Sequence, residues 1–327
     1  MCALSTDTSL LGRVFDSYQN MTQIAACVRE AARQRSLKRV RVLELSRRTT
    51  GLTDYLPEAL ITNFPTHSND APILSDPVSL PYPDNSFHAC LISDVYEHVP
   101  PEMRPGLLNE MLRVTEGLVL IGCPNGNEFV SRLDRMVFDF IWGKYGERFT
   151  PLAQHVEFGV EPIEEIVKSI EARGADRVTV LPANYVYRWI HLILIYFDLQ
   201  HKTSHTDVFQ PFNRIYNERL SPYDYREPCY RYLILVPTIA ELDMTALNNS
   251  LTGRFEKPAS VKETDELLVQ TFRELDASAA DRLRASALEI ASLRQRIAEL
   301  ETPGLEGFIE RVVSRIRRLI AKNKRRA

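Results

Sequence analysis

The sequence predicts an α/β fold built on a mostly parallel, doubly wound sheet. Short apolar runs with the length of buried strands lie at residues 38–45, 89–92 and 117–123. Residues 101–114 carry apolar side chains at helical spacing, among them Leu108 and Met111. Strands that alternate with helices in this way are typical of parallel sheets whose crossover helices cover both faces.

The remaining elements follow in chain order. A first helix extends to about Arg35, and Gly174 ends a later helix at residues 161–173, because glycine is favoured just after a helix end. Further strands are predicted at residues 60–64, 73–76, 177–181 and 230–236. Residues 185–225 are rich in aromatic and apolar side chains, so we expect helices there that cover one end of the sheet.

Four polar side chains follow the strand at residues 89–92, namely Ser93, Asp94, Glu97 and His98. Ligands of open parallel sheets bind at the carboxyl ends of the strands, so this cluster is the candidate site. The alternative is a strand-to-helix turn in which Asp94 or Glu97 caps the next helix. His98 could equally hydrogen-bond a backbone carbonyl in such a turn. The flanking motif favours the functional interpretation.

That flanking motif is the turn at residues 80–87, LPYPDNSF, which precedes SDVYEHV at residues 93–99. Together they resemble the LPFPDNSFD…SDVLEHV signature of class I S-adenosylmethionine-dependent methyltransferases, in the type 11 branch often found beside glycosyltransferases. Residues 154–159, QHVEFG, are similar to another stretch of that branch. The resemblance covers roughly residues 38–237. It implies a Rossmann-like, seven-stranded, mostly parallel sheet that binds S-adenosylmethionine and transfers its methyl group.

The resemblance also implies cofactor-binding residues on successive segments: Glu44, Ser46, Gly51, Asn63, Asp76, Val78, Ser93 and Asp94. In the family pattern Glu44 lies beside the cofactor loop, and Asp76 faces the adenine amino group. Ser93 and Asp94 lie beside the methyl donor. The cofactor is preactivated, so the protein mainly has to orient the acceptor. A hydroxyl or carboxylic acid acceptor also needs a base, for which His98 is the first candidate and His155 the second.

Two positions depart from the family pattern. The cofactor loop is normally glycine-rich so that bare backbone can approach the ligand, but residues 46–51 read SRRTTG with a single glycine. Arg47 or Arg48 can either pair with the cofactor carboxylate or fill its space. The acid that usually ends the second strand is missing, and Asn63 hydrogen-bonds more weakly than a carboxylate. The alternative function is therefore a catalytically inactive scaffold that binds partners or membrane through its C-terminal helices.

Composition and spacing argue against several other classes. A net charge of −3 and a pI near 6.2 make nucleic acid an improbable partner. The five cysteines include no C-x-x-C pair, and His155 with Glu157 offers too few ligands, so no metal site is expected. The N-terminus lacks the pattern of a signal peptide, and the most apolar run is too short to span a bilayer, which favours a cytoplasmic location. The aromatic residues 185–197 belong either to the core or to an acceptor lid that includes Tyr187, Arg188 and Trp189.

The C-terminal part carries its own patterns, after a predicted linker at residues 241–264. Apolar residues at alternating spacings of three and four predict a coiled-coil helix over residues 265–301, and hence a homo-oligomer. Residues 305–327 predict a basic amphipathic helix. Such a helix binds an anionic membrane surface, here at the inner face of the membrane, or docks on a protein partner.

The sequence therefore predicts an N-terminal helical segment at residues 1–37, a methyltransferase-like domain at residues 38–240 and the C-terminal helices. The expected activity is methyl transfer from S-adenosylmethionine to a small-molecule or glycan-type acceptor. The branch that the motifs resemble suggests cell-surface polysaccharide biosynthesis as the setting.

Overall fold

A computed structural model describes residues 9–46, 51–68, 71–72, 78–202, 209–252 and 291–292. Several predictions lie outside these residues: the strand at residues 73–76 with Asp76, the loop residues Arg47 and Arg48, and the basic helix at residues 305–327. The predicted coiled coil at residues 265–301 also lies outside them, apart from the helical residues 291–292.

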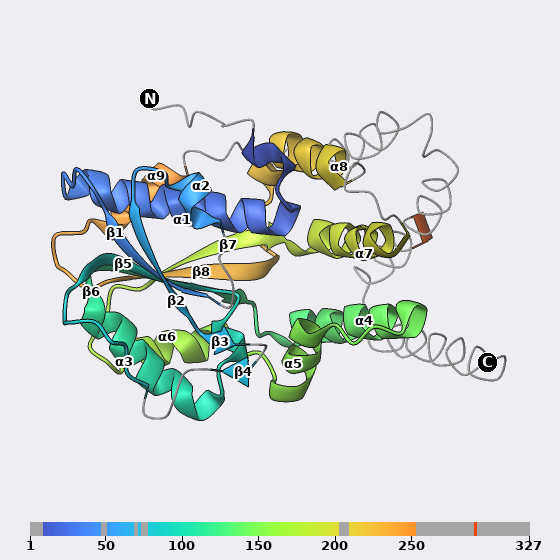
Figure 1. Cartoon of the computed structure of the whole chain (residues 1–327), viewed down its shortest axis with the longest axis horizontal. Helices are drawn as coiled ribbons and strands as arrows, with labels where there is room; N and C mark the ends of the chain where they lie inside the picture. The colour runs from blue at the N-terminus through green and yellow to red at the C-terminus, as the bar shows by residue number, and fades with distance from the viewer. Residues whose placement is uncertain are drawn as a thin grey trace.

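The core of the fold is a six-stranded sheet with the order β2-β1-β5-β6-β8-β7 (Figure 1). Its strands are β1 (Arg41–Ser46), β2 (Leu60–Pro65), β5 (Phe87–Ser93), β6 (Thr115–Pro124), β7 (Thr179–Tyr185) and β8 (Cys229–Pro237). Parallel pairs join β2, β1, β5 and β6, whereas β8 is antiparallel to both of its neighbours. The predicted mostly parallel α/β sheet is confirmed.

The predicted number of seven strands is wrong for the part of the chain that the structure describes, because the main sheet there has six. After β2 the chain forms a separate two-stranded antiparallel ladder, β3 (His67–Ser68) and β4 (Ala71–Pro72). The additional strand was expected at residues 73–76, which lie outside the described residues.

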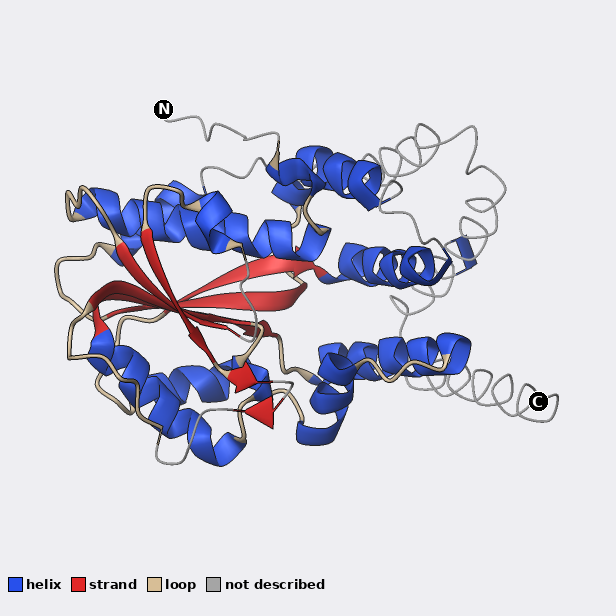
Figure 2. Ribbon diagram, in the orientation of Figure 1, coloured by secondary structure: helices blue, strands red, loops and turns tan. Residues whose placement is uncertain are grey.

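Helices cover both faces of the sheet (Figures 1 and 2). One face carries α1 (Phe15–Gln34), α2 (Leu52–Tyr55) and α9 (Met244–Thr252), and the other carries α3 (Arg104–Val114) and α6 (Ile163–Glu171). Side chains alternate between the two faces along each strand, so Val42 packs under α1 while Leu43 packs under α3. Because both faces are buried, the central strands are mostly apolar, as in β5, where His88 and Ser93 are the polar residues.

A third cluster of buried side chains lies beyond the ends of the strands, at the right of Figure 1. It joins α4 (Glu128–Tyr145), α5 (Thr150–Phe158), α7 (Val186–Lys202) and α8 (Phe209–Ile215). The predicted helical cover at residues 185–225 corresponds to α7, α8 and the short turns that follow. Helix α4 was not predicted, although Asn127 caps it by accepting a hydrogen bond from the Val130 N–H at 2.8 Å.

Two predicted segments contain helices that pack on the sheet. The N-terminal helical segment contains α1, whose buried residues such as Ile24 belong to the core on one face of the sheet. Within the predicted linker, α9 buries Leu247 and Leu251 in that same core. Within the described ranges, no helix has both the length and the apolar character required to cross a membrane.

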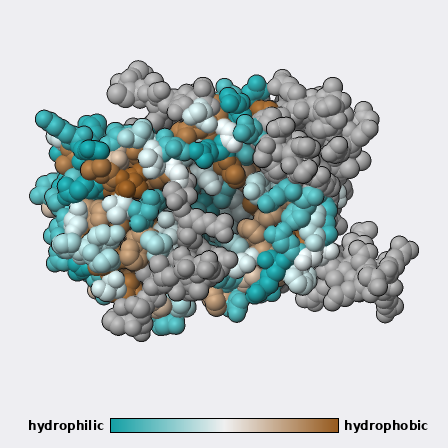
Figure 3. Space-filling model, in the orientation of Figure 1, coloured by the Kyte–Doolittle hydropathy of each residue, from teal (hydrophilic) through white to brown (hydrophobic). Residues whose placement is uncertain are grey.

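We predict that Leu108→Ala on α3 lowers the free energy of unfolding by about 2–5 kcal/mol, because the truncation leaves a cavity in a packed core. Leu108 is 1 % exposed. The measurement is urea denaturation followed by circular dichroism. The matched control is Leu60→Ala at the start of β2, where the side chain is 43 % exposed; Figure 3 shows apolar surface over this part of the molecule. If both variants lost the same free energy of unfolding, the placement of Leu108 in the packed core would be contradicted.

Candidate functional site

The carboxyl ends of β1 and β5 form the topological switch point of the sheet. From β1 the chain continues to β2 on one side, whereas β5 pairs with β1 on the other side. The strands are parallel, so Ser46 at the end of β1 and Ser93 at the end of β5 lie at the same edge. Ligands of doubly wound sheets bind at such a point.

Asp94, directly after β5, is held at this edge by contacts from distant segments. Its backbone has the left-handed φ of 55°, which aspartate tolerates better than most residues. The guanidinium of Arg231 on β8 lies 2.7 Å from Oδ1 of Asp94 and 3.4 Å from Oδ2 of Asp16 on α1. The side-chain amide of Asn20 donates to Ser93 Oγ at 2.6 Å and to Asp94 Oδ2 at 3.2 Å. The end of β5 is thus tied to α1 and β8.

Next to Asp94, a short turn of 3-10 helix, η2 (Tyr96–His98), buries Glu97 and His98 at 3 % and 5 % exposure. Burial, together with the nearby charge of Asp94, raises the pKa of Glu97 to about 7. The imidazole of His155 on α5 stacks on that of His98, with ring centroids 5.1 Å apart and an angle of 22° between the planes. The structure thus brings the two predicted catalytic histidines together.

His155 is oriented by a buried carboxylate. Its Nδ1 lies 2.7 Å from Oδ2 of Asp134 on α4, and the other oxygen of Asp134 accepts a hydrogen bond from the Tyr230 hydroxyl at 2.8 Å. Burial alone would lower the pKa of His155, but the hydrogen bond and the charge of Asp134 raise it. Helix α5 carries His155 into the interior, where the residue is 9 % exposed.

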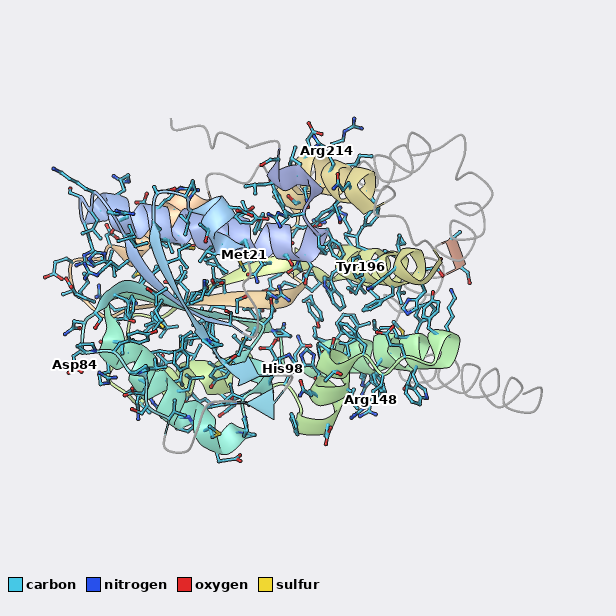
Figure 4. All side chains as sticks on the ribbon, viewed as in Figure 1. Met21, Asp84, His98, Arg148, Tyr196 and Arg214 are labelled. Atoms are coloured by element: carbon cyan, nitrogen blue, oxygen red, sulfur yellow. The ribbon has the colours of Figure 1, made fainter. Side chains whose placement is uncertain are left out.

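These groups line one end of a cavity of about 540 Å³. Its walls come from α1, the end of β5, α5, α7 and β8; on α7, the apolar side chains of Trp189, Ile193 and Phe197 face it. In Figure 4, His98 lies where the sheet meets α5, and Tyr196 and Arg148 lie on the elements around it. The cavity therefore has a charged end at the sheet and an apolar wall beneath α7.

The other predicted cofactor residues are distributed around the sheet. Glu44 is buried in the middle of β1 and is in register with Asn63 on β2. Asn63 is exposed, and β2 continues beyond it to Pro65, so it does not end the strand. Gly51 starts α2 with a left-handed φ of 79°. Val78 is buried in the core on the α3 face.

Of the predicted acceptor-lid residues, Arg188 has a structural partner. Its guanidinium pairs with the carboxylate of Asp224, and the two side chains are 5 % and 1 % exposed. Asp224 also accepts a hydrogen bond from the Tyr216 hydroxyl at 2.8 Å. Arg188 thus points into the helical cluster, whereas Trp189 contributes to the cavity wall.

The signature turn at residues 80–87 lies at the opposite edge of the sheet from the site, as the positions of Asp84 and His98 in Figure 4 show. Arg113 on α3 holds it, by donating to the carbonyls of Leu80 at 3.1 Å and Tyr82 at 2.9 Å and to the Asp84 carboxylate at 2.7 Å. The turn therefore fixes the entry of the chain into β5 and contributes no group to the cavity.

Sequence reasoning missed Arg231 and Asp134, and it excluded a metal site. Arg231 did leave a signal, as a charged residue inside the apolar run of residues 230–236. Asp134 is a polar residue next to Leu133 on the buried face of α4. The expectation of no metal site rested on pairing His155 with Glu157, but Glu157 instead faces Arg148 at 3.5 Å. In the structure His155 meets Glu97 and His98, and these three residues could hold a metal ion.

No protein-family model and no curated protein sequence matches the chain. Solved structures with a distant likeness include a SAM-dependent methyltransferase from Thermotoga maritima, with 12 % identity, a TM-score of 0.37 and coverage of 71 % of this chain and 99 % of that one. Another comes from Archaeoglobus fulgidus, with 16 % identity, a TM-score of 0.37 and coverage of 65 % and 92 %. A third, from Methanosarcina mazei, has 13 % identity, a TM-score of 0.34 and coverage of 61 % and 92 %. TM-scores below 0.5 mark a distant likeness, from which no function is transferred to this chain.

We predict that Arg188→Met lowers the free energy of unfolding by about 3–5 kcal/mol, because it leaves the buried carboxylate of Asp224 without its cation. Urea denaturation at pH 7 measures the loss. Arg132→Met is the matched control, since Arg132 pairs with Glu128 on the exposed side of α4. Its effect should stay within about 0.5 kcal/mol. A small effect of Arg188→Met would show that the ion pair contributes little to the packing of α7.

Proposed function

We propose that the protein is an S-adenosylmethionine-dependent methyltransferase that acts on a small-molecule or glycan-type acceptor. One observation carries the proposal: the polar ends of β1 and β5 meet at the switch point of the sheet, and the residues that follow β5 line a cavity with a charged, histidine-containing end. The motifs at residues 80–87 and 93–99 support the same family. Cell-surface polysaccharide biosynthesis, as the setting, rests on the resemblance alone.

The described residues at the switch point fit the cofactor. Ser46, Ser93 and Asp94 present hydroxyl and carboxylate groups there, and the left-handed Gly51 begins the helix that follows the loop. We assign the binding of S-adenosylmethionine to these four residues together with Glu44. Asn63, Asp76 and Val78 complete the set that the resemblance implies. When bound, the cofactor supplies an electrophilic methyl group on a sulfonium, so the protein has to position the acceptor against it.

The cavity beside the switch point is the proposed acceptor site. Its apolar wall at Trp189, Ile193 and Phe197 can pack against the body of an acceptor, or stack on a sugar ring. At its charged end, His98 is the first candidate and His155 the second for accepting a proton from an acceptor hydroxyl. Asp134 would stabilise the imidazolium that His155 then forms.

The alternative is an inactive scaffold of the same fold. It is favoured by the cofactor loop, which has one glycine in residues 46–51. In that case Arg47 or Arg48 fills the cofactor position, and the helices predicted at residues 265–327 bind partners, a second copy or an anionic membrane surface. Binding of the cofactor separates the two functions.

We predict that S-adenosylmethionine and S-adenosylhomocysteine bind to the full-length protein in isothermal titration calorimetry. Asp94→Asn should weaken the binding of both by about tenfold or more, because a charge-assisted hydrogen bond is worth roughly 1.5–3 kcal/mol. The asparagine keeps the shape of the side chain at the end of β5.

Asp84→Asn is the matched control, since Asp84 belongs to the same signature but lies at the opposite edge of the sheet. Its affinity for the two ligands should equal that of the unmodified protein. If neither ligand binds to the unmodified protein at high micromolar concentration, the scaffold function replaces the enzyme.

A further inference from the structure

Three potential metal ligands lie together at the charged end of the cavity. Glu97 and His98 come from η2 and His155 from α5, and each offers a ligand atom within 4.8 Å of the others. All three residues are at least nine-tenths buried, with exposures of 3 %, 5 % and 9 %. Two elements that are distant in sequence thus bring imidazole and carboxylate groups close together.

The orientation of His155 leaves one of its nitrogens directed at this point. A carboxylate only accepts hydrogen bonds, so the contact with Asp134 places a proton on Nδ1 of His155. Nε2 is buried and has no hydrogen-bond partner among the described residues. A carboxylate that fixes one imidazole nitrogen while the other faces a ligand is the usual arrangement behind a metal-binding histidine.

Glu97 supplies the matching oxygen. Its Oε1 lies 3.9 Å from Nε2 of His155, too far for a hydrogen bond, and its Oε2 is buried without a hydrogen-bond partner in the described ranges. Metal–ligand bonds of about 2.0–2.2 Å allow two ligand atoms on either side of an ion to be about 4 Å apart. The separation therefore suits a bridging cation.

The charges around the cluster also favour a cation. The carboxylates of Asp16, Asp94, Glu97 and Asp134 surround this end of the cavity, and the guanidinium of Arg231 contacts two of them. Buried carboxylates are costly unless they are paired or coordinate a metal. An ion between Glu97 and His155 would offset this negative charge.

We propose that Glu97, His98 and His155 bind a divalent first-row transition-metal ion such as Zn²⁺, Mn²⁺ or Co²⁺. Two imidazoles and one carboxylate select these ions over Mg²⁺ and Ca²⁺, which prefer oxygen ligands. Three protein ligands leave coordination positions open toward the cavity. The role of the ion rests on the proposed function: when bound, it would supply Lewis acidity toward an acceptor hydroxyl. Both histidines would then be ligands rather than bases.

The test is titration of the chelator-treated, full-length protein with Co²⁺, without S-adenosylmethionine, followed by visible absorption. We expect one equivalent of Co²⁺ to bind and about a tenfold excess of Mg²⁺ to leave the bands unchanged. His155→Ala and the isosteric Glu97→Gln should each weaken binding by at least about tenfold, and Asp134→Asn by about 10–100-fold. His88→Ala is the matched control, because His88 lies at the other end of β5 and contacts the Arg41 N–H.

The absence of Co²⁺ absorption bands would overturn the proposal, and so would displacement of the bound Co²⁺ by Mg²⁺. Equal losses of Co²⁺ affinity in His155→Ala and His88→Ala would also overturn it. Thermal unfolding of each variant shows whether the variant is folded. If His155→Ala does not fold, the loss of Co²⁺ affinity is read from Glu97→Gln instead. Binding of S-adenosylmethionine to the metal-free protein is measured separately by calorimetry. Loss of Co²⁺ binding with intact S-adenosylmethionine binding contradicts the metal site alone, whereas absence of S-adenosylmethionine binding contradicts the proposed function.

Discussion

The buried guanidinium of Arg231 is the interaction on which the site depends. It joins β8 to Asp94 at the end of β5 and to Asp16 on α1, three segments that are distant in the sequence. Arg231 is 4 % exposed, so burying its charged guanidinium would be costly without the carboxylates of Asp94 and Asp16. The same contacts hold Asp94 in its left-handed conformation, and η2 starts from there. The placement of Glu97 and His98 at the charged end of the cavity follows from this anchor.

The helical cluster beyond the strands completes what the sheet begins. Helix α4 contributes Asp134, α5 contributes His155 and α7 contributes the apolar wall of the cavity. Each side chain is set by packing within the cluster, as in the stacking of Trp189 on Tyr230, whose hydroxyl donates to Asp134. The residues at the end of β5 thus supply Asp94, Glu97 and His98, while the helices supply His155, its supporting carboxylate and the enclosure. The cavity lies between two separately packed cores.

Local patterns were enough to predict most of the sheet and part of the site. Apolar runs located β1, β2, β5, β6, β7 and β8 to within a few residues. The signal is simplest in β5, β6 and β8, because they are buried along most of their length. The cluster from Ser93 to His98 was found because it follows a strand directly. Asp134 and Arg231 were missed because their partners are far along the chain: Asp134 meets Tyr230 and Arg231 meets Asp16. The proximity of Glu97, His98 and His155 was missed for the same reason, since spacing within one segment cannot show that α5 faces η2.

The position of the signature turn has a consequence for how related chains are compared. Its contacts with Arg113 serve the docking of α3 and the register of β5, at the edge remote from the cavity. Selection for folding alone would therefore act on residues 80–87 whatever groups line the cavity. A search built on that motif responds to the fold, whereas a search that couples Asp94, Glu97 and His98 to a later histidine and its supporting acid responds to the groups around the cavity. The two kinds of search would divide the same set of homologues differently.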